Sequence, residues 1–255
     1  MVRSPRTARN RIPWVIVTVV GLFLAIIIRS QYVDYYQGLE TPSGILTLKP
    51  TLPAKSTPTP ITPTVAEKPP VALPLKVPFT SQAPLALWDP LHEEACEEAS
   101  LLMVYYYRTG QKFTSPLEAD SEIKKLVAWE ESNGYKVDLT VEELVAVAAG
   151  YMKLKTGRVI IDPTVEQIKT ELKAGRPVIV PAAGRELHNP NFTAPGPIYH
   201  MLVLKSYDET GFIVNDPGTR RGENYHYGFK TIMDAMHDWE PDNILNGQKA
   251  VVVFD

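Results

Sequence analysis

EEACEEASLLMVYYY, residues 93–107, contains the only cysteine of the 255-residue chain and places it where an apolar run begins. From Cys96 onward, apolar side chains recur at helical spacing, at Ala99, Leu102, Met103 and Tyr106. The preceding Trp88-Asp89-Pro90 is typical of a loop, so we expect Cys96 in the first turn of a helix. The helix dipole favours a thiolate there, but Glu97 and Glu98 oppose it, so a reactive Cys96 needs a cationic partner. A lone cysteine is more often a small buried apolar residue.

Charge is unevenly distributed along the chain. The formal net charge is −3, and residues 1–30 contain five arginines and no acid, so the remainder is more acidic than the whole. Nucleic-acid binding needs a basic face, and we therefore expect no nucleic-acid partner. A single cysteine also excludes an internal disulfide.

The N-terminal region has the pattern of a membrane anchor. Residues 12–28 are uncharged and mostly apolar, which predicts a transmembrane signal-anchor helix. Four arginines precede this run and one follows, which predicts a cytoplasmic tail at residues 1–11 and an extracytoplasmic body at the cell membrane. A cleaved secretory signal is the alternative, although Arg29-Ser30-Gln31-Tyr32 lacks a small-x-small cleavage pattern.

A linker and one folded domain are expected to follow. Residues 29–74 become rich in proline and threonine, which predicts an extended extracytoplasmic linker. Within residues 75–255 we expect a helix from Cys96, further helices at 115–133, 140–151, 164–174 and 229–237, and strands at 177–180, 200–204, 211–214 and 250–254. Because the helices come mostly first and the strands afterwards, the fold class is α+β.

Two residues are candidate partners for Cys96. His200 begins an apolar strand directly after a Gly/Pro/Asn-rich loop, and Asp216 ends the next strand. If these strands form a hairpin across residues 207–211, the imidazole and the carboxylate lie at the same end and can form a hydrogen bond. Taken singly, a solvated edge histidine and an Asp-Pro-Gly turn are ordinary features. With a cysteine at a helix start, they form the arrangement of a thiol hydrolase.

Other candidates are weaker. Gln82 has a neutral N–H₂ donor that, with the Cys96 backbone N–H, suits an oxyanion hole, although an ordinary loop glutamine is the alternative. His92 and Cys96 are four residues apart, but a second cysteine and a third ligand are missing nearby, so we expect no metal and no cofactor. Trp88 and Trp239 are candidates for a substrate groove, with burial in the core as the commoner use of tryptophan.

Four blocks of the sequence resemble one family. They are VPFxxQ from Val77, ACxxAS from Ala95, YHMLV from Tyr199 and VNDP from Val214. Together they are similar to the double-glycine, bacteriocin-processing peptidase-like branch of the papain-fold cysteine peptidases, over about residues 75–255. The resemblance implies a papain-like fold, with N-terminal helices packed on an antiparallel sheet. Glu97 stands where the best-known members have glycine.

The resemblance also implies roles for the candidate site residues. Cys96 would be the nucleophile, His200 the general base and then acid, Asp216 the residue that orients His200, and Gln82 the oxyanion donor. The implied protein is a cysteine peptidase that acts on a peptide or protein through an acyl-enzyme. A cell-wall peptide hydrolase or acyltransferase with the same site, and a non-catalytic binding module for peptide or wall polymer, remain open alternatives.

Overall fold

The computed structural model describes residues 74–255. The predicted cytoplasmic tail, the transmembrane helix and the linker up to residue 73 lie outside the described residues. Within residues 74–255, none of the helices has the length and apolar character needed to cross a bilayer.

The helices begin and end where local sequence signals place them. Ser115 caps its helix by accepting the Glu118 N–H, and Thr140 and Thr164 each form a reciprocal capping box. Gly110, with φ of 70°, ends the cysteine-bearing helix in the left-handed conformation. The helices are α2 (Pro90–Glu93), α3 (Cys96–Thr109), α4 (Pro116–Ser132), α5 (Val141–Gly150), α6 (Val165–Lys173) and α7 (Phe229–Ala235), with short 3₁₀ turns at Gly184–Leu187 and Ile244–Asn246.

A six-stranded antiparallel sheet forms the other half of the domain. Its spatial order is β1-β6-β2-β3-β4-β5. The central strand β3 pairs with β4 as the predicted hairpin, with Leu204 opposite Val214. The strands are β1 (Gly157–Ile161), β2 (Val178–Ala183), β3 (Tyr199–Tyr207), β4 (Gly211–Asn215), β5 (Tyr225–Gly228) and β6 (Ala250–Phe254).

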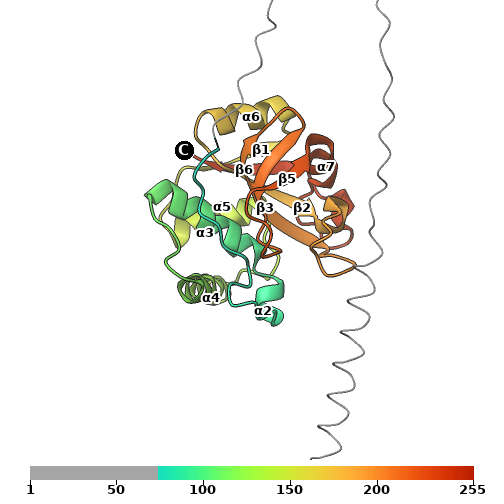
Figure 1. The fold of residues 1–255 in the computed structure, drawn as a ribbon. Coiled ribbons are helices and arrows are strands. Elements are labelled where there is room, and N and C mark those ends of the chain that lie inside the picture. The colour runs from blue at the N-terminus through green and yellow to red at the C-terminus, as the bar shows by residue number, and fades with distance from the viewer. Residues whose placement is uncertain (1–73) are drawn as a thin grey trace, which may run out of the picture. The chain divides into compact units, whose positions relative to one another are not determined.

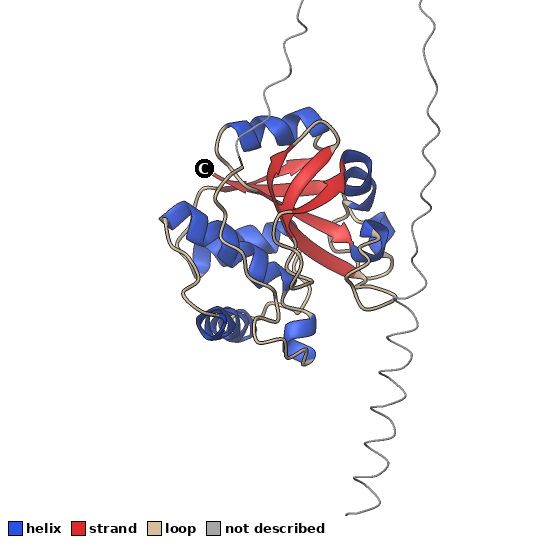
Figure 2. Ribbon diagram, viewed as in Figure 1, coloured by secondary structure: helices blue, strands red, loops and turns tan. Residues whose placement is uncertain are grey.

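Helices cover both faces of this sheet, as Figures 1 and 2 show. Successive side chains of a strand point to opposite faces, so Met201 and Val203 of β3 pack in the core under α3, α4 and α5. Leu202 and Leu204 pack in a second core with α6 and α7. Every residue of β3 is therefore buried, which holds His200 at a fixed place at the start of this strand.

The α+β class, the main helices and four of the strands are confirmed. Three elements were missed: α2, where a loop was expected at Trp88-Asp89-Pro90, and the strands β1 and β5. Because β1 precedes α6, the order of helices first and strands afterwards is only approximate. Both missed strands lie at edges of the sheet, where half-exposed side chains give a weak alternation and pairing comes from segments distant in sequence.

Candidate active site

Cys96 lies at the start of α3, as predicted, and is 5% exposed. Its Sγ–H donates to Glu97 Oε2 at 2.9 Å, and Sγ accepts the backbone N–H of Met201 at 3.3 Å. Burial, followed by the charge and hydrogen bond of Glu97, raises the pKa of the thiol well above its usual value. The resting Cys96 is therefore a neutral thiol, despite its position at a helix N-terminus.

His200 and Asp216 meet as the hairpin predicted. His200 Nε2 lies 2.8 Å from Asp216 Oδ1, and both side chains are almost completely buried. The carboxylate fixes Nε2 as the donor nitrogen, which leaves Nδ1 to exchange a proton. Met201, whose N–H reaches the sulfur, is the next residue after His200, so β3 brings the imidazole and the thiol into one site.

Asp216 is held by three further donors. Its Oδ2 accepts from Tyr227 Oη at 2.7 Å and from Asn189 Nδ2 at 3.1 Å, and its Oδ1 accepts the Gly218 N–H at 3.0 Å. Burial opposes ionisation of this carboxyl, but His200 and these donors outweigh it and lower the pKa of Asp216. The carboxylate is thus charged and fixed in direction, as a group that orients an imidazole must be.

The His200 ring is packed as well as hydrogen-bonded. Phe192 lies edge-on to it with ring centroids 5.3 Å apart. Gly218 lies so close that a Cβ there would be 2.8 Å from His200 Cε1. Both neighbours come from loops, one before β3 and one after β4, and they restrict rotation of the ring.

Gln82 reaches the site but points its amide elsewhere. Its backbone N–H donates to the Pro217 carbonyl at 2.9 Å, which ties this segment to the loop after Asp216. Its Nε2 donates to the carbonyl oxygens of His92 and Glu93 in α2, at 2.9 Å each. The amide hydrogens are thus engaged in this conformation, and the predicted oxyanion role of Gln82 stays a prediction.

A groove of about 1180 Å³ opens over these groups. Gln82, Cys96 and His200 line it, and Asp216 lies behind the imidazole. Trp88, 43% exposed, and Trp239 also line the groove, so the core position favoured for Trp88 is wrong. Acidic residues line it at Glu93, Glu94 and Asp138, and basic residues at Arg220 and Arg221.

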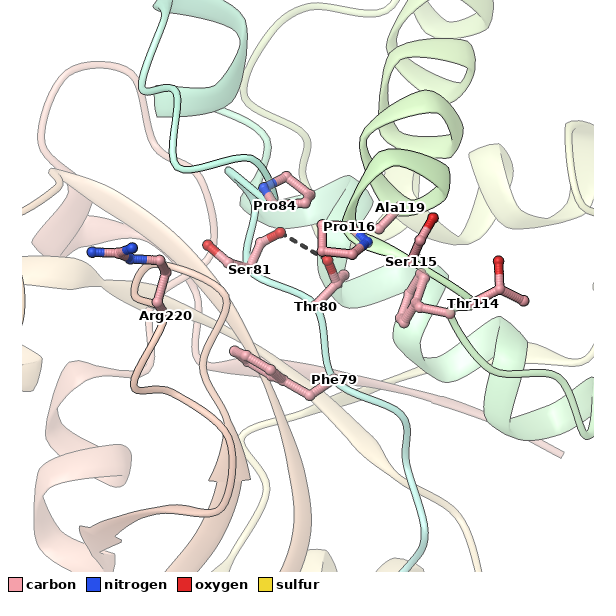
Figure 3. Close-up of a pocket in the computed structure, with 10 residues that line it drawn as sticks. Phe79, Thr80, Ser81, Pro84, Thr114, Ser115, Pro116, Ala119 and Arg220 are labelled. Atoms are coloured by element: carbon pink, nitrogen blue, oxygen red, sulfur yellow. Dashed lines mark hydrogen bonds between the residues drawn. The ribbon is translucent and has the colours of Figure 1, made fainter.

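A smaller pocket of about 380 Å³ lies along the segment that precedes Gln82. Figure 3 shows Phe79, Thr80 and Ser81 on one side of it and the first turn of α4 on the other. The Thr80 hydroxyl donates to the Ser81 carbonyl at 3.0 Å. Arg220 lines both pockets, but this one has neither thiol nor imidazole in its lining, so we place the chemistry in the larger groove.

His92 has a structural environment. Its Nδ1 lies 2.7 Å from Asp89 Oδ1 and its Nε2 lies 2.9 Å from Asp120 Oδ1, so the ring joins α2 to α4. Through its carbonyl, His92 also positions Gln82. Within residues 74–255, no group of three or more His, Cys, Asp or Glu side chains is arranged to hold a metal ion.

Sequence reasoning missed Asn189 and Tyr227 as partners of Asp216. Asn189 lies in a loop, and Tyr227 lies on the unpredicted strand β5, so only long-range folding brings them to the carboxylate. Glu97 was recognised as an opposing charge, and the structure adds that it accepts the thiol hydrogen. A glutamate directly after a helix-start cysteine was the only available signal of that contact.

A buried thiol, a histidine bonded to aspartate and an open groove define the class of thiol hydrolases. The chain belongs to the Peptidase C39-like family, whose sequence profile matches residues 74–243. This membership supports a cysteine peptidase, and the α+β fold with its antiparallel sheet fits a papain-like fold. The bacteriocin-processing branch stays a prediction.

The chain is also similar to solved structures. A Bacillus anthracis protein described as a C39-like peptidase aligns with a TM-score of 0.49 and 17% identity, over 73% of this chain and 98% of that one. No curated protein matches this chain.

Proposed function

We propose that this protein is a membrane-anchored, exported cysteine peptidase that cleaves a peptide bond through an acyl-enzyme on Cys96. The observation that carries the proposal is the buried His200–Asp216 pair, 2.8 Å apart, in the groove that Cys96 also lines. Family membership supports the reaction type. The arginine-flanked apolar run at residues 12–28 supports the anchor and the direction of export.

The reaction follows from the roles that these groups can take. His200 Nδ1 accepts the thiol proton, and Sγ attacks the carbonyl carbon to form a tetrahedral intermediate. Backbone N–H groups at the start of α3 face the developing oxyanion, with Gln82 as a side-chain donor if its amide turns from α2. His200 then gives its proton to the leaving amine, and the C–N bond breaks. A water deprotonated by His200 hydrolyses the thioester and restores the thiol.

The substrate is a peptide or protein that lies along the groove. The two tryptophans give it apolar contact surface, and its wall carries charges of both signs. A cell-wall peptide, or transfer of the acyl group to an amine, would use the same acyl-enzyme.

The raised pKa of Cys96 favours a second candidate function. A thiol held neutral by Glu97 suits a non-catalytic module that binds a peptide or wall polymer in the groove. That function predicts binding that survives replacement of Cys96 by alanine, and no turnover.

The deciding experiment is the pH dependence of iodoacetamide alkylation of the full-length protein, with and without His200→Ala. The chain has one thiol, so the rate needs no assignment. We expect His200→Ala to slow alkylation at neutral pH and to shift the thiol titration to higher pH, because the imidazolium no longer stabilises the thiolate. His226→Ala, which removes an exposed histidine on β5, is the matched control.

Turnover of an unstructured peptide library completes the test. We expect cleavage by the wild type and none by Cys96→Ala. Identical alkylation profiles for wild type and His200→Ala, together with no cleavage, would establish the binding module instead.

A further inference from the structure

Glu97 makes a contact with the reacting atom that the proposed mechanism does not use. Its Oε2 accepts the Cys96 Sγ–H at 2.9 Å. Its Oε1 accepts the backbone N–H of Leu139 at 3.3 Å, so the carboxyl group is held between the nucleophile and the loop before α5. Glu97 is 1% exposed, so these contacts are shielded from water, and the backbone N–H of Glu97 also donates to its own carboxyl group.

The surroundings of Glu97 are rich in other acids. Glu98 lies beside it on α3, Asp138 faces it from the loop before α5, and Glu130 lies on α4. Tyr199 of β3 donates its hydroxyl to the Leu139 carbonyl at 2.9 Å and to Asp238 Oδ1 at 3.3 Å, and burial, then the charge of Glu97, raise its pKa. Burial, then the charge of Glu98, raise the pKa of the Glu97 carboxyl well above its usual value. A proton is therefore held more readily by Glu97 than by a glutamate in water.

The geometry points to Glu97 as a further catalytic residue that controls the proton on Cys96, an inference that rests on the proposed thiol chemistry. As a carboxylate, Glu97 accepts the S–H hydrogen and holds the thiol neutral. As a carboxylic acid, it donates its own O–H to the sulfur, which stabilises a thiolate. The productive ion pair then consists of Cys96 thiolate, His200 imidazolium and neutral Glu97.

The proton balance sets the direction of the pH effect. The form with Glu97 ionised and both Cys96 and His200 neutral gains one proton in becoming the productive form: the thiol proton passes to His200, and Glu97 takes one from solvent. Rising pH therefore removes the productive form, because loss of the Glu97 proton would place a carboxylate beside a thiolate. We therefore assign the fall in rate on the high-pH side of the pH–rate profile to loss of the Glu97 proton.

Glu97→Gln tests the inference in the full-length protein. The amide oxygen can keep the Leu139 N–H, which turns the N–H₂ group toward the sulfur, where it donates to a thiolate at every pH. We expect alkylation at pH 7 to become about tenfold faster, because a like charge is replaced by a donor, and the upper limb of any turnover profile to move to higher pH. Alkylation that is unchanged or slower would overturn the inference.

Glu98→Gln is the matched control. Glu98 is the next residue on the same helix, equally acidic and buried, but it hydrogen-bonds Glu130 and not the sulfur. Loss of the Glu98 charge lowers the pKa of Cys96, which favours the thiolate, and lowers the pKa of Glu97, which opposes it. Because the two effects oppose each other, we expect Glu98→Gln to leave the alkylation rate at pH 7 within about twofold of wild type. An equal acceleration in both variants would show a general charge effect and overturn the specific role of Glu97.

A measurement on the wild-type protein covers the case in which Glu97→Gln fails to fold. The single thiol gives one infrared S–H stretching band, which Cys96→Ser removes. We expect this band at lower frequency than that of a free thiol, because the S–H donates to a carboxylate. A band at the free-thiol frequency would overturn the inference. Failure of the proposed function is detected separately, by identical profiles for wild type and His200→Ala.

Discussion

At the scale of single residues, the site depends on how tightly the His200 ring is held. Asp216 fixes one ring nitrogen, while Phe192 and Gly218 pack against the ring itself. Asp216 in turn has Asn189 and Tyr227 as donors. In the proposed reaction His200 moves a proton between the sulfur and the leaving amine, so its ring must keep its position to within a fraction of an ångström. These contacts supply that constraint.

Gly218→Ala should displace the imidazole. The new Cβ would lie 2.8 Å from His200 Cε1 and 2.8 Å from Phe192 Cε1, closer than real Cβ contacts allow. We expect the turnover of peptide substrate to fall by about 10²-fold, a typical consequence of misplacing a catalytic group by about 1 Å. Steady-state kinetics on the full-length protein measures the loss.

Gly228→Ala is the control for this substitution. A Cβ at Gly228 meets Thr231 Oγ1 at 3.7 Å, an ordinary contact, and φ there is −58°. Activity of Gly228→Ala should stay close to wild type. Full activity in Gly218→Ala would mean that the ring does not need this packing.

At the scale of elements, α3 and α4 meet through two buried acids. Glu98 and Glu130 are each 4% exposed and share a side-chain hydrogen bond. Two carboxylates cannot bond to each other unless one keeps a proton. Burial, then the charge of Glu98, raise the pKa of Glu130 to about 11, so Glu130 is the group that keeps it at neutral pH.

This pair predicts how stability depends on pH. Between the unfolded glutamate pKa of about 4.3 and the folded value of about 11, the folded chain holds a proton that the unfolded chain has lost. Stability should therefore fall as pH rises through this window, by up to about 1.4 kcal/mol per pH unit for one proton. Glu130→Gln supplies a permanent N–H donor to Glu98 and should raise the melting temperature at pH 8 more than at pH 5.

Thermal unfolding followed by circular dichroism at both pH values checks this prediction. Glu131→Gln, an exposed neighbour on α4, should leave the melting temperature nearly unchanged. If Glu130→Gln lowers the melting temperature at both pH values, the proton that Glu130 holds does not limit the stability of the wild type at pH 8.

At the scale of the whole molecule, the described domain brings four distant segments to one groove. Gln82 comes from the segment before α2, Cys96 from α3, His200 from β3 and Asp216 from the end of the β3–β4 hairpin region. The sheet and α3 meet in one apolar core, which fixes Cys96 relative to the start of β3, where His200 lies. The anchoring of this domain to a membrane is a separate proposal, based on residues 12–28.

The anchor is tested by deleting residues 1–28. The full-length protein should remain in the membrane pellet after an alkaline carbonate wash, and the deleted form should be released. Alkaline phosphatase fused after Asp255 should be active in cells only with the N-terminal segment present, since that enzyme needs export. Release of the full-length protein by carbonate would contradict a transmembrane helix, and an inactive fusion would contradict the predicted orientation.

Much of the fold followed from local patterns in the sequence. Several features are encoded within a few neighbouring residues. They are the helical periodicity after Cys96, the capping residues Ser115, Thr140 and Thr164, and the apolar runs of the central strands. The pairing of His200 with Asp216 was also predictable, because a short hairpin joins their strands. These features need only short-range geometry.

What the tertiary structure alone decided is how distant groups meet. The edge strands β1 and β5 and the donors from Asn189 and Tyr227 to Asp216 depend on segments that only the folded sheet brings together. The Gln82 amide turns toward the unpredicted helix α2, which begins only a few residues further on. Burial, which no local pattern measures, raises the pKa of Cys96 and lets Glu97 compete for the thiol proton. The sequence by itself therefore indicated that Cys96, His200 and Asp216 come together, and three-dimensional packing determined their further partners and the protonation state in which they rest.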